Sequence, residues 1–395
     1  MESKKDLYQE LGVASDKSGI KANFDEIIAK EYPYAFVNIV TDPYEDSRAV
    51  TLHLDGDGSK FIQRLLDYYE HGDENVFAGM MDDALTMNLG DVAASGFVFG
   101  PMLIADVIDQ GLNPEIKAIV LRQVKKRFQE LLQLYAKFGF NVKIKFMGGE
   151  TADLPYQVKS LVFNVAVNAW EEKVNIVTGE TKPGDIIIGV QSDGQAAWED
   201  KPNSGGMSNG QTLLRSGAMD LSFNEKYPDL GDGHFYKGHY RPHDKPEILE
   251  GMSVGEALLS PTRQWAIVIR EIIKELKNRG IFHMLHGITM NTGGGATKIK
   301  NIGKAVIYSK TMPEPPALFR FIQAETGQPW RHMYTSCNCG IGIDIVGEDN
   351  EEFKNAVKGV VFGCCLKPYE LGFVFESTDD ENHVTLNTPY GKFEY

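Results

Sequence analysis

The sequence predicts two consecutive α/β halves, and three observations support this fold class. The chain has 395 residues, a length typical of two or three domains. In both halves, short apolar runs of strand type alternate with longer segments whose apolar residues recur every 3.6 positions. Strands in each half also end in loops rich in glycine, acidic and hydroxyl residues. The turn-rich segment 178–185 separates the halves.

We therefore divide the chain into three parts. Residues 1–45 are polar with scattered aromatic residues and are interpreted as an arm with a short helix. Residues 46–178 form an amino-terminal domain, and residues 179–395 a carboxy-terminal domain that carries two inserted loops at 195–206 and 221–255. The second loop has no clear period, and such long irregular segments are usually functional excursions or lids.

The net charge of −15 argues against a nucleic-acid groove or an anionic membrane as the main partner. A small phosphorylated ligand remains compatible with this net charge, because a few lysines and N–H groups can bind one locally.

No apolar run approaches the ~18 residues of a membrane span, and the first residues lack a signal-peptide core. The four cysteines, at 337, 339, 364 and 365, lie too close in sequence to pair well, which favours a reducing cytosol.

The first half opens with a strand at 49–54, followed by the loop Asp55–Lys60 and a helix from Phe61. An Asp-Gly pair is the commonest hairpin signal, so a simple turn is one interpretation of this loop. The other is an anion site, since its glycines let N–H groups approach closely and Lys60 adds a charge. Asp55 and Asp57 would then supply oxygen ligands for Mg²⁺.

Residues 82–94 have a helical pattern that includes Asp91, whose carboxylate, considered alone, is expected to face water. A strand is expected at 97–107, bearing Asp106. Asn113 and Pro114 then start a long helix that ends at Gly139.

A strand at 142–146 runs into the second glycine-acid loop, 147–153, and another strand follows at 161–169. In the second half, 186–190 has the pattern of a buried strand, and Ser208 or Asn209 is placed to cap the next helix. Later elements are a helix from Trp265 to Gly280, a strand at 281–285, a glycine turn at 292–295 that opens a helix, and a strand-rich tail.

Several common site motifs are absent from the sequence. It has no G-x-x-x-x-G-K-[ST], no G-x-G-x-x-G after a strand and no G-x-S-x-G. These absences exclude a P-loop, weaken a dinucleotide fold and weaken a serine hydrolase.

The ordered set of glycine-acid segments resembles the phosphoribosylformylglycinamidine cyclo-ligase (aminoimidazole ribonucleotide synthetase) family. Asp55–Lys60 is similar to that family's Asp-Gly-Val-Gly-Thr-Lys, and Gly148–Pro155 to its Gly-Gly-Glu-Thr-Ala-Glu-Met-Pro. Further landmarks in the family's order are Gly90-Asp91, Pro101–Asp106, Ser208–Gly210, Leu259–Thr262, Thr292–Gly295 and Asn338–Gly342.

Three departures from the family pattern stand out. Gly90 replaces the asparagine of an Asn-Asp pair, and Met207 and Met290 replace two histidines. Methionine neither titrates nor donates hydrogen bonds, so any role of those histidines in binding the second substrate is lost at these positions. His286 or a histidine of the 221–255 loop is a candidate substitute.

The resemblance implies a two-domain synthetase fold of the α/β (α+β) class, whose amino-terminal sheet pairs with that of a second subunit in a homodimer. It also implies ATP and Mg²⁺ as cofactors, a phosphoribosyl formamidine substrate and a role in cytoplasmic purine biosynthesis. The candidate metal ligands are Asp55, Asp91 and Glu150. The candidate catalytic residues are Lys60, with Asp106 and Asp153 as possible bases. The candidate nucleotide-binding residues are Asp55, Gly56, Gly58, Ser59, Lys60, Gly148, Gly149, Thr151, Ser208, Asn209, Gly293 and Gly294.

Two alternatives stay open. One is another ATP-dependent member of the superfamily, such as thiamine-phosphate kinase. Selenophosphate synthetase and the hydrogenase-maturation members are disfavoured, because the first cysteine is Cys337 and the chain ends at Tyr395. The other alternative is a nucleotide-binding homologue without catalysis, in which Met207 and Met290 mark the loss of activity.

Overall fold

The structure is a computed structural model that describes residues 6–13, 27–140, 144–231 and 234–395. The expected position 142 and much of the amino-terminal arm lie outside these ranges. Of the arm, α1 (Leu7–Glu10) is a single helical turn. No helix among the described residues is long and apolar enough to cross a bilayer.

The first half forms a five-stranded sheet with the strand order β1-β2-β5-β3-β4. All its neighbouring strands are antiparallel except β3 and β4, which are parallel and are connected through the long helix α5. The strands are β1 (Val40–Asp42), β2 (Glu45–Gly56), β3 (Met102–Gln110), β4 (Ile144–Asp153) and β5 (Leu161–Glu172). The helices are α3 (Lys60–His71), η1 (Glu74–Phe77), α4 (Gly79–Ala94), α5 (Pro114–Lys137) and η2 (Lys173–Asn175).

The second half forms a seven-stranded sheet with the order β12-β11-β8-β10-β6-β9-β7. Its strands are β6 (Ile186–Gln191), β7 (Leu285–Met290), β8 (Val306–Thr311), β9 (Ile341–Gly347), β10 (Pro368–Glu376), β11 (His383–Thr388) and β12 (Gly391–Glu394). Its helices are α6 (Gln211–Ala218), α7 (Phe223–Lys226), η3 (Pro228–Leu230), η4 (Glu247–Leu249), α8 (Val254–Leu259), α9 (Trp265–Asn278), η5 (Phe282–Met284), η6 (Gly295–Asn301), α10 (Ala317–Thr326), α11 (Trp330–Ser336) and α12 (Glu351–Gly363).

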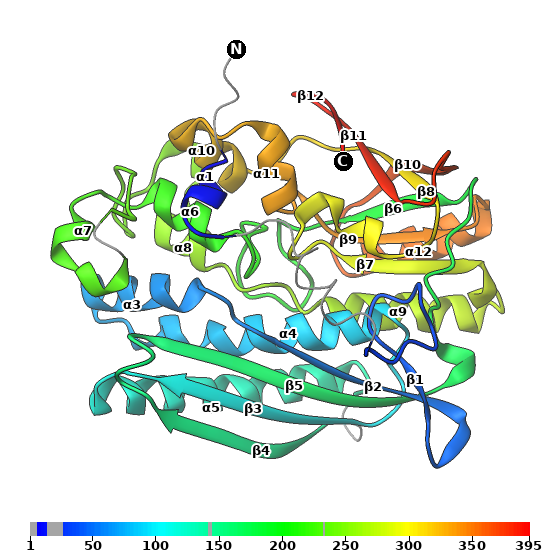
Figure 1. The fold of residues 1–395 in the computed structure, drawn as a ribbon, viewed down its shortest axis with the longest axis horizontal. Coiled ribbons are helices and arrows are strands. Elements are labelled where there is room, and N and C mark those ends of the chain that lie inside the picture. The colour runs from blue at the N-terminus through cyan, green and yellow to red at the C-terminus, as the bar shows by residue number, and fades with distance from the viewer. Residues whose placement is uncertain (1–5, 14–26, 141–143, 232–233) are drawn as a thin grey trace.

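Helix α4 lies at the centre, between the five-stranded sheet and the second half (Figure 1). It packs on β2 and β5 from one side and on α9 from the other. Because it is covered all round, nearly every side chain along it is buried. This includes Asp91, so the expectation that its carboxylate faces water is wrong.

Three expected elements differ from the structure. The strand expected at 97–107 begins only at Met102, because the N–H groups of residues 98–100 donate to the Glu171 carboxylate instead of a strand partner. The loop expected at 147–153 is the second part of β4, which pairs with β3 across a bulge. The strand expected at 281–285 is the short helix η5, and the strand follows it.

The cap of α6 also differs from the expectation. Gly210 is its N-cap residue, with φ +78°, and no side chain caps the helix. A left-handed backbone at this position suits glycine, so the Ser208 and Asn209 side chains are left for other contacts.

A buried acid on α3 gives a pH-dependent prediction. Burial raises the pKa of Asp67 to about 7, although Gln63 donates a hydrogen bond to it. Its unfolded-state pKa is near 4, so the folded state binds the extra proton and stability falls as pH rises from about 4 to 7. Asp67→Asn should therefore raise the free energy of unfolding at pH 8, by up to about 4 kcal/mol, and change it little at pH 4.

Urea unfolding at both pH values measures this effect. The exposed Asp229→Asn variant is the control, expected to change stability by less than about 0.5 kcal/mol at either pH. An equal effect of Asp67→Asn at pH 4 and pH 8 would contradict the assignment.

Candidate active site

The loop that precedes α3 meets the loop that precedes α6, so the two halves contribute to one junction. Ser59 Oγ lies 3.0 Å from Thr212 Oγ1, and Arg215 Nη1 donates to the Ser59 carbonyl at 2.8 Å. Gly58 lies close to the Ser208 carbonyl, 3.5 Å from the place a Cβ would take. Two segments predicted to bind nucleotide, far apart in sequence, are therefore in contact.

The glycine turn after β7 lies at the same junction. The Asn209 amide is 3.2 Å from the place of a Cβ on Gly293. Gly294 has φ +97°, and a Cβ on Gly295 would be 2.4 Å from the Cys337 carbonyl. The consecutive glycines are thus explained by a left-handed turn that packs directly against another backbone.

Buried polar atoms without a hydrogen-bond partner gather around this junction. Buried polar groups are normally satisfied, so these atoms are available to hydrogen-bond a water or a ligand. Among the described residues they include atoms of Asp57, Asp91, Asn209, Gln211, Arg215 and Asn291. Both acids and amides are present, which suits a polar ligand.

Lys60 lies below the loop and faces protein. Its Nζ is fully buried, 3.1 Å from Asp83 Oδ1, and donates to the Ser260 carbonyl. Asp83 also accepts from Arg64 and from the N–H and hydroxyl of Thr262. Burial would raise the pKa of Asp83, but the two cations outweigh it and hold that pKa below its usual value. Asp83 could not be predicted from the sequence, because an acid in a helical run has no distinctive spacing.

Asp55 and Asp91, two of the predicted metal ligands, are brought close by His53 and Asn88. His53 Nε2 is 3.4 Å from Asp91 Oδ2, and His53 Nδ1 is 3.0 Å from Asn88 Oδ1. Asn88 Nδ2 donates to the Asp55 carbonyl. Burial alone would lower the pKa of His53, but the Asp91 carboxylate raises it above its ordinary value.

Asp106 lies in the same sheet row as Asp55. Both are paired with Val165, whose side chain is buried, so the two carboxylates project from the helix-covered face about two strand spacings apart, or roughly 10 Å. The Asp106 carboxylate also covers Gly149, where a Cβ would be 1.7 Å from it. Burial raises the pKa of Asp106.

The structure does not bring Glu150 to Asp55 within one chain. Glu150 is exposed on the edge strand β4, three strand spacings from β2, or roughly 14 Å. Gly148 and Thr151 flank it on the same strand. Asp153 ends that strand, exposed and paired with Lys117, which lowers the pKa of the Asp153 carboxyl.

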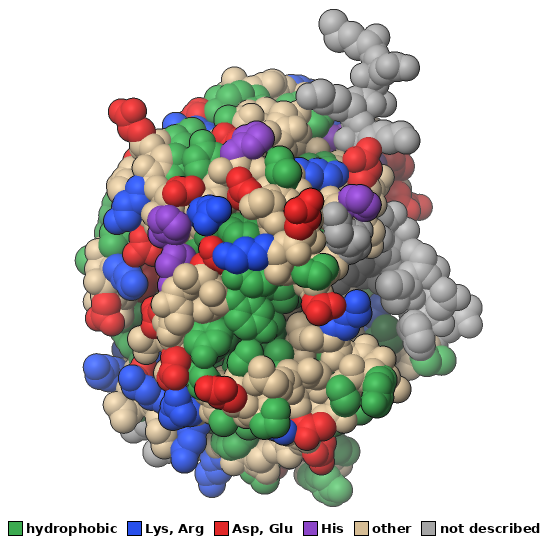
Figure 2. Space-filling model, turned by 90° about the vertical axis from the view of Figure 1, so that its left-hand side faces the viewer, with side chains coloured by type: hydrophobic (Ala, Val, Ile, Leu, Met, Phe, Trp, Pro, Cys, Tyr) green, Lys and Arg blue, Asp and Glu red, His purple; other side chains and the backbone are tan. Residues whose placement is uncertain are grey.

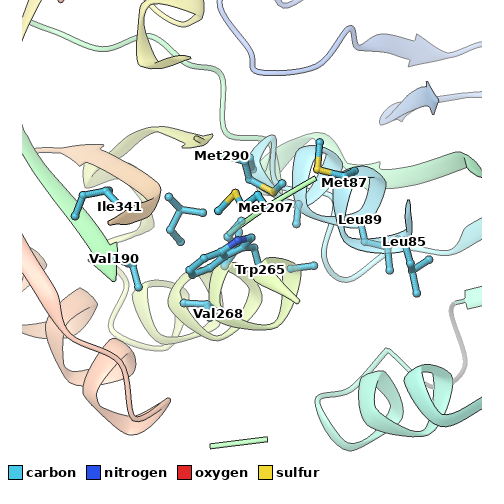
Figure 3. Packing of buried hydrophobic residues seen from close by; sticks show 14 of the residues in the cluster. Leu85, Met87, Leu89, Val190, Met207, Trp265, Val268, Met290 and Ile341 are labelled. Atoms are coloured by element: carbon cyan, nitrogen blue, oxygen red, sulfur yellow. The ribbon is translucent and has the colours of Figure 1, made fainter. Parts of the chain in front are cut away.

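Methionines fill the positions where the resembled family has histidines. Met207 and Met290 are buried beside Trp265, and α4 approaches from the other side (Figure 3). A Cβ at Gly90 would be 2.0 Å from Met290 Sδ. The departures at positions 90 and 290 are therefore in direct contact, which the sequence alone did not reveal. His286, a candidate substitute, is instead bound to Asp185 at 2.8 Å.

A cavity of about 1660 Å³ lies beside the junction. Its walls include Arg64 and Thr262 of the Lys60 network, part of the 195–206 loop and the end of the 221–255 loop. Residues at the end of the second inserted loop therefore border this cavity. On the face shown in Figure 2, acidic and basic side chains are interspersed and do not form a single-sign surface.

Mg²⁺ would need partners in addition to this chain. Within the described residues, no group of three or more His, Cys, Asp or Glu side chains is arranged to hold a metal ion. Mg²⁺ usually takes one or two carboxylates and completes its shell with waters and phosphate oxygens. Asp91 fits such a role, because its Oδ1 is buried without a partner.

Solved structures with the same architecture define the class as a two-domain synthetase fold. Hydrogenase maturation protein HypE in complex with ATP has a TM-score of 0.51 at 13% identity, covering 97% of this chain and 96% of that one. Thiamine monophosphate kinase from Aquifex aeolicus has 0.51 at 14%, covering 98% and 99%. T. maritima PurL complexed with FGAR has 0.53 at 12%, covering 98% and 54%.

Within that class, the chain is a relative of the phosphoribosylformylglycinamidine cyclo-ligases. It is 28% identical to the Methanocaldococcus jannaschii enzyme over 313 residues, which cover 78% of this chain and 73% of the relative. It is 25% identical to the Methanobrevibacter smithii enzyme over 350 residues, covering 86% and 83%. No family model matches the chain. The resemblance and the fold class expected from the sequence are confirmed.

Proposed function

We propose that this protein closes formylglycinamidine ribonucleotide to aminoimidazole ribonucleotide with ATP, a step of purine biosynthesis. The observation that carries this proposal is the junction where the glycine loops of both halves meet around unpartnered buried polar atoms. The cyclo-ligase names of the relatives support it.

The reaction requires a better leaving group than an amide oxygen. ATP would transfer its γ-phosphoryl group to the formamide oxygen, leaving ADP. The amidine nitrogen then attacks the activated carbon, the ring closes, phosphate leaves with the former amide oxygen, and a proton is lost. Such transfer depends on positioning and on charge neutralisation more than on a covalent nucleophile. A junction of glycine loops with buried polar groups suits that demand.

We assign the Mg²⁺ ligands of this reaction to Asp55 and Asp91, with ATP phosphate oxygens completing the shell. Bound Mg²⁺ would neutralise charge on the transferring phosphoryl group. His53 holds one oxygen of Asp91 and leaves the other free. Asp106 is favoured over Asp153 as the base, because the Asp106 carboxyl is half-buried with a raised pKa, whereas Lys117 keeps Asp153 ionised.

The partner is proposed to be a second copy of the chain, bound through the outer face of the five-stranded sheet. Leu52 and Leu54 alternate outward on β2 and are 72% and 64% exposed. Val162 on the neighbouring strand β5 and Val107 on β3 are also exposed. Exposed apolar side chains of this number on one sheet are typical of an interaction surface.

Leu54→Asp combined with Leu52→Asp should convert the dimer to a monomer, because it buries two charges in the interface. Sedimentation velocity measures the mass. Leu221→Asp, an exposed leucine on the inserted loop, is the control and should leave the dimer intact. A wild-type protein that sediments as a monomer, or a dimer that survives the double substitution, would contradict the proposed surface.

Incubation with formylglycinamidine ribonucleotide and MgATP tests the function. Equal amounts of aminoimidazole ribonucleotide and ADP are expected. A second candidate, a nucleotide-binding homologue without catalysis, is favoured by Met207 and Met290, which bring apolar side chains to positions that hold histidine in the family. Tight ATP binding without product would support this candidate and refute the cyclo-ligase proposal.

A further inference from the structure

Arg215 is a buried cation that no carboxylate among the described residues neutralises. It lies on α6 and is 3% exposed. Nη1 donates to the Ser59 carbonyl, the guanidinium lies 4.5 Å from the centre of the Phe235 ring, and Nε has no partner. Burial lowers the pKa of Arg215 to about 10. Buried charges are normally paired, as Arg263 is with Glu199, so Arg215 lacks its expected anion.

Residues in contact with Arg215 or next to its contacts reach the protein surface. Gly58 is exposed there, and Ser59 and Thr212 are half-buried with their hydroxyl groups in contact. Ser59 is also the N-cap residue of the twelve-residue helix α3, and its side chain makes no capping hydrogen bond. The first N–H groups of a helix without a side-chain cap favour an anion.

The other charges near the start of α3 do not neutralise Arg215. Lys60 and Arg64 share the single carboxylate of Asp83. The remaining acid, Asp57, is fully buried beside them, so the three cations Lys60, Arg64 and Arg215 still outnumber the two carboxylates. In a chain of net charge −15, this is a local excess of positive charge.

We propose that Arg215, rather than Lys60, supplies the positive charge that holds a phosphate group at Gly58, Ser59 and Thr212. Lys60 then stabilises the junction through Asp83. The identity of the ligand rests on the proposed function, in which both ATP and the phosphoribosyl substrate carry phosphate. A charge just below the protein surface attracts a phosphate more strongly than the same charge in bulk water, because the effective dielectric constant near the surface is lower than that of water.

Arg215→Met and Arg215→Lys test this role by calorimetric titration with a non-hydrolysable ATP analogue plus Mg²⁺ and with ribose 5-phosphate. Arg215→Met should weaken one of these ligands by about 10- to 100-fold. It should keep or raise the melting temperature of the free protein, since it removes an unpaired buried charge. Loss for the ATP analogue assigns the site to ATP, and loss for ribose 5-phosphate assigns it to the substrate.

Arg215→Lys retains a positive charge and should therefore lose less affinity than Arg215→Met. A loss as large as that of Arg215→Met would show that only the Ser59 hydrogen bond matters, and wild-type affinity of Arg215→Met for both ligands would show no role. Either result overturns the proposal. Arg279→Met, which removes a surface arginine paired with Glu275, is the control.

Thr212→Val tests the same phosphate site if Arg215→Met does not fold. It retains Arg215 and should weaken the same ligand, and unchanged binding of both ligands overturns the proposal. The two proposals fail separately. If Arg215→Met loses affinity for a ligand but the wild-type protein does not turn over formylglycinamidine ribonucleotide, only the cyclo-ligase function is refuted. If the wild-type protein turns over the substrate and Arg215→Met binds both ligands with wild-type affinity, only the role of Arg215 is refuted.

Discussion

Asp83→Asn is expected to lower the free energy of unfolding by about 3–5 kcal/mol, the largest stability effect predicted for this chain. Asp83 is the carboxylate that neutralises Lys60 and Arg64, and all three side chains are almost completely buried. An amide in its place would leave two buried cations without a counter-charge. It would also weaken the contact with Thr262 from the second half.

Urea unfolding at pH 7 measures this loss. Asp82→Asn is the matched control on the same helix, because the partner of Asp82, Arg127, is partly exposed and can be solvated. This control should lower the free energy of unfolding by only about 1 kcal/mol. The pKa of Asp83 is lowered in the folded state, so its contribution is complete above about pH 4 and is lost as pH falls through the lower folded value. An Asp83→Asn protein as stable as Asp82→Asn would contradict the role of this network.

The sequence predicted those features that depend on local chemistry. The start of α5 at Asn113 and Pro114 is confirmed, with the Asn113 side chain accepting from the Ile116 N–H. The helical pattern of 82–94 is also confirmed as α4. Both follow from rules that involve neighbours within one helical turn.

Features that depend on distant partners could not be predicted. The strand starts at Met102 because the N–H groups of residues 98 and 100 donate to the carboxylate of Glu171, which lies on a different strand. The burial of Asp91 depends on the packing of α4 on the five-stranded sheet, where His53 of β2 lies beside its carboxylate. Likewise, Lys60 has the sequence context of a phosphate ligand, but Asp83 and Ser260 determine where its charge lies.

The position of the candidate site follows from the same arrangement. Helix α4 carries Asp83 near one end and Asp91 near the other, and it is covered by both halves. Asp83 connects α3 to the second half, whereas Asp91 faces the end of β2 through His53. One central helix therefore both joins the halves and presents an acid to the proposed nucleotide. A substitution at Asp91 should separate these roles, because it leaves the Asp83 contacts intact.

Asp91→Asn is expected to reduce Mg²⁺-dependent ATP turnover by about 10²- to 10³-fold while the fold persists. Asparagine has nearly the same shape and still offers an oxygen to His53, so the melting temperature should change little. The amide lacks the charge that holds Mg²⁺, so the Mg²⁺ concentration for half-maximal turnover should rise together with the loss of rate.

Steady-state ADP release, measured over a range of Mg²⁺ concentrations, tests this expectation. Glu150→Gln in the same assay tests the remaining predicted metal ligand, which lies three strands from Asp55 in a single chain. If Asp91→Asn turns over like wild type at every Mg²⁺ concentration, Asp91 does not hold the metal. If only Glu150→Gln loses activity, the metal site lies at the edge strand β4. Asp55 and Asp91 then have a structural role, because their contacts through His53 and Asn88 would serve only to join β2 to α4.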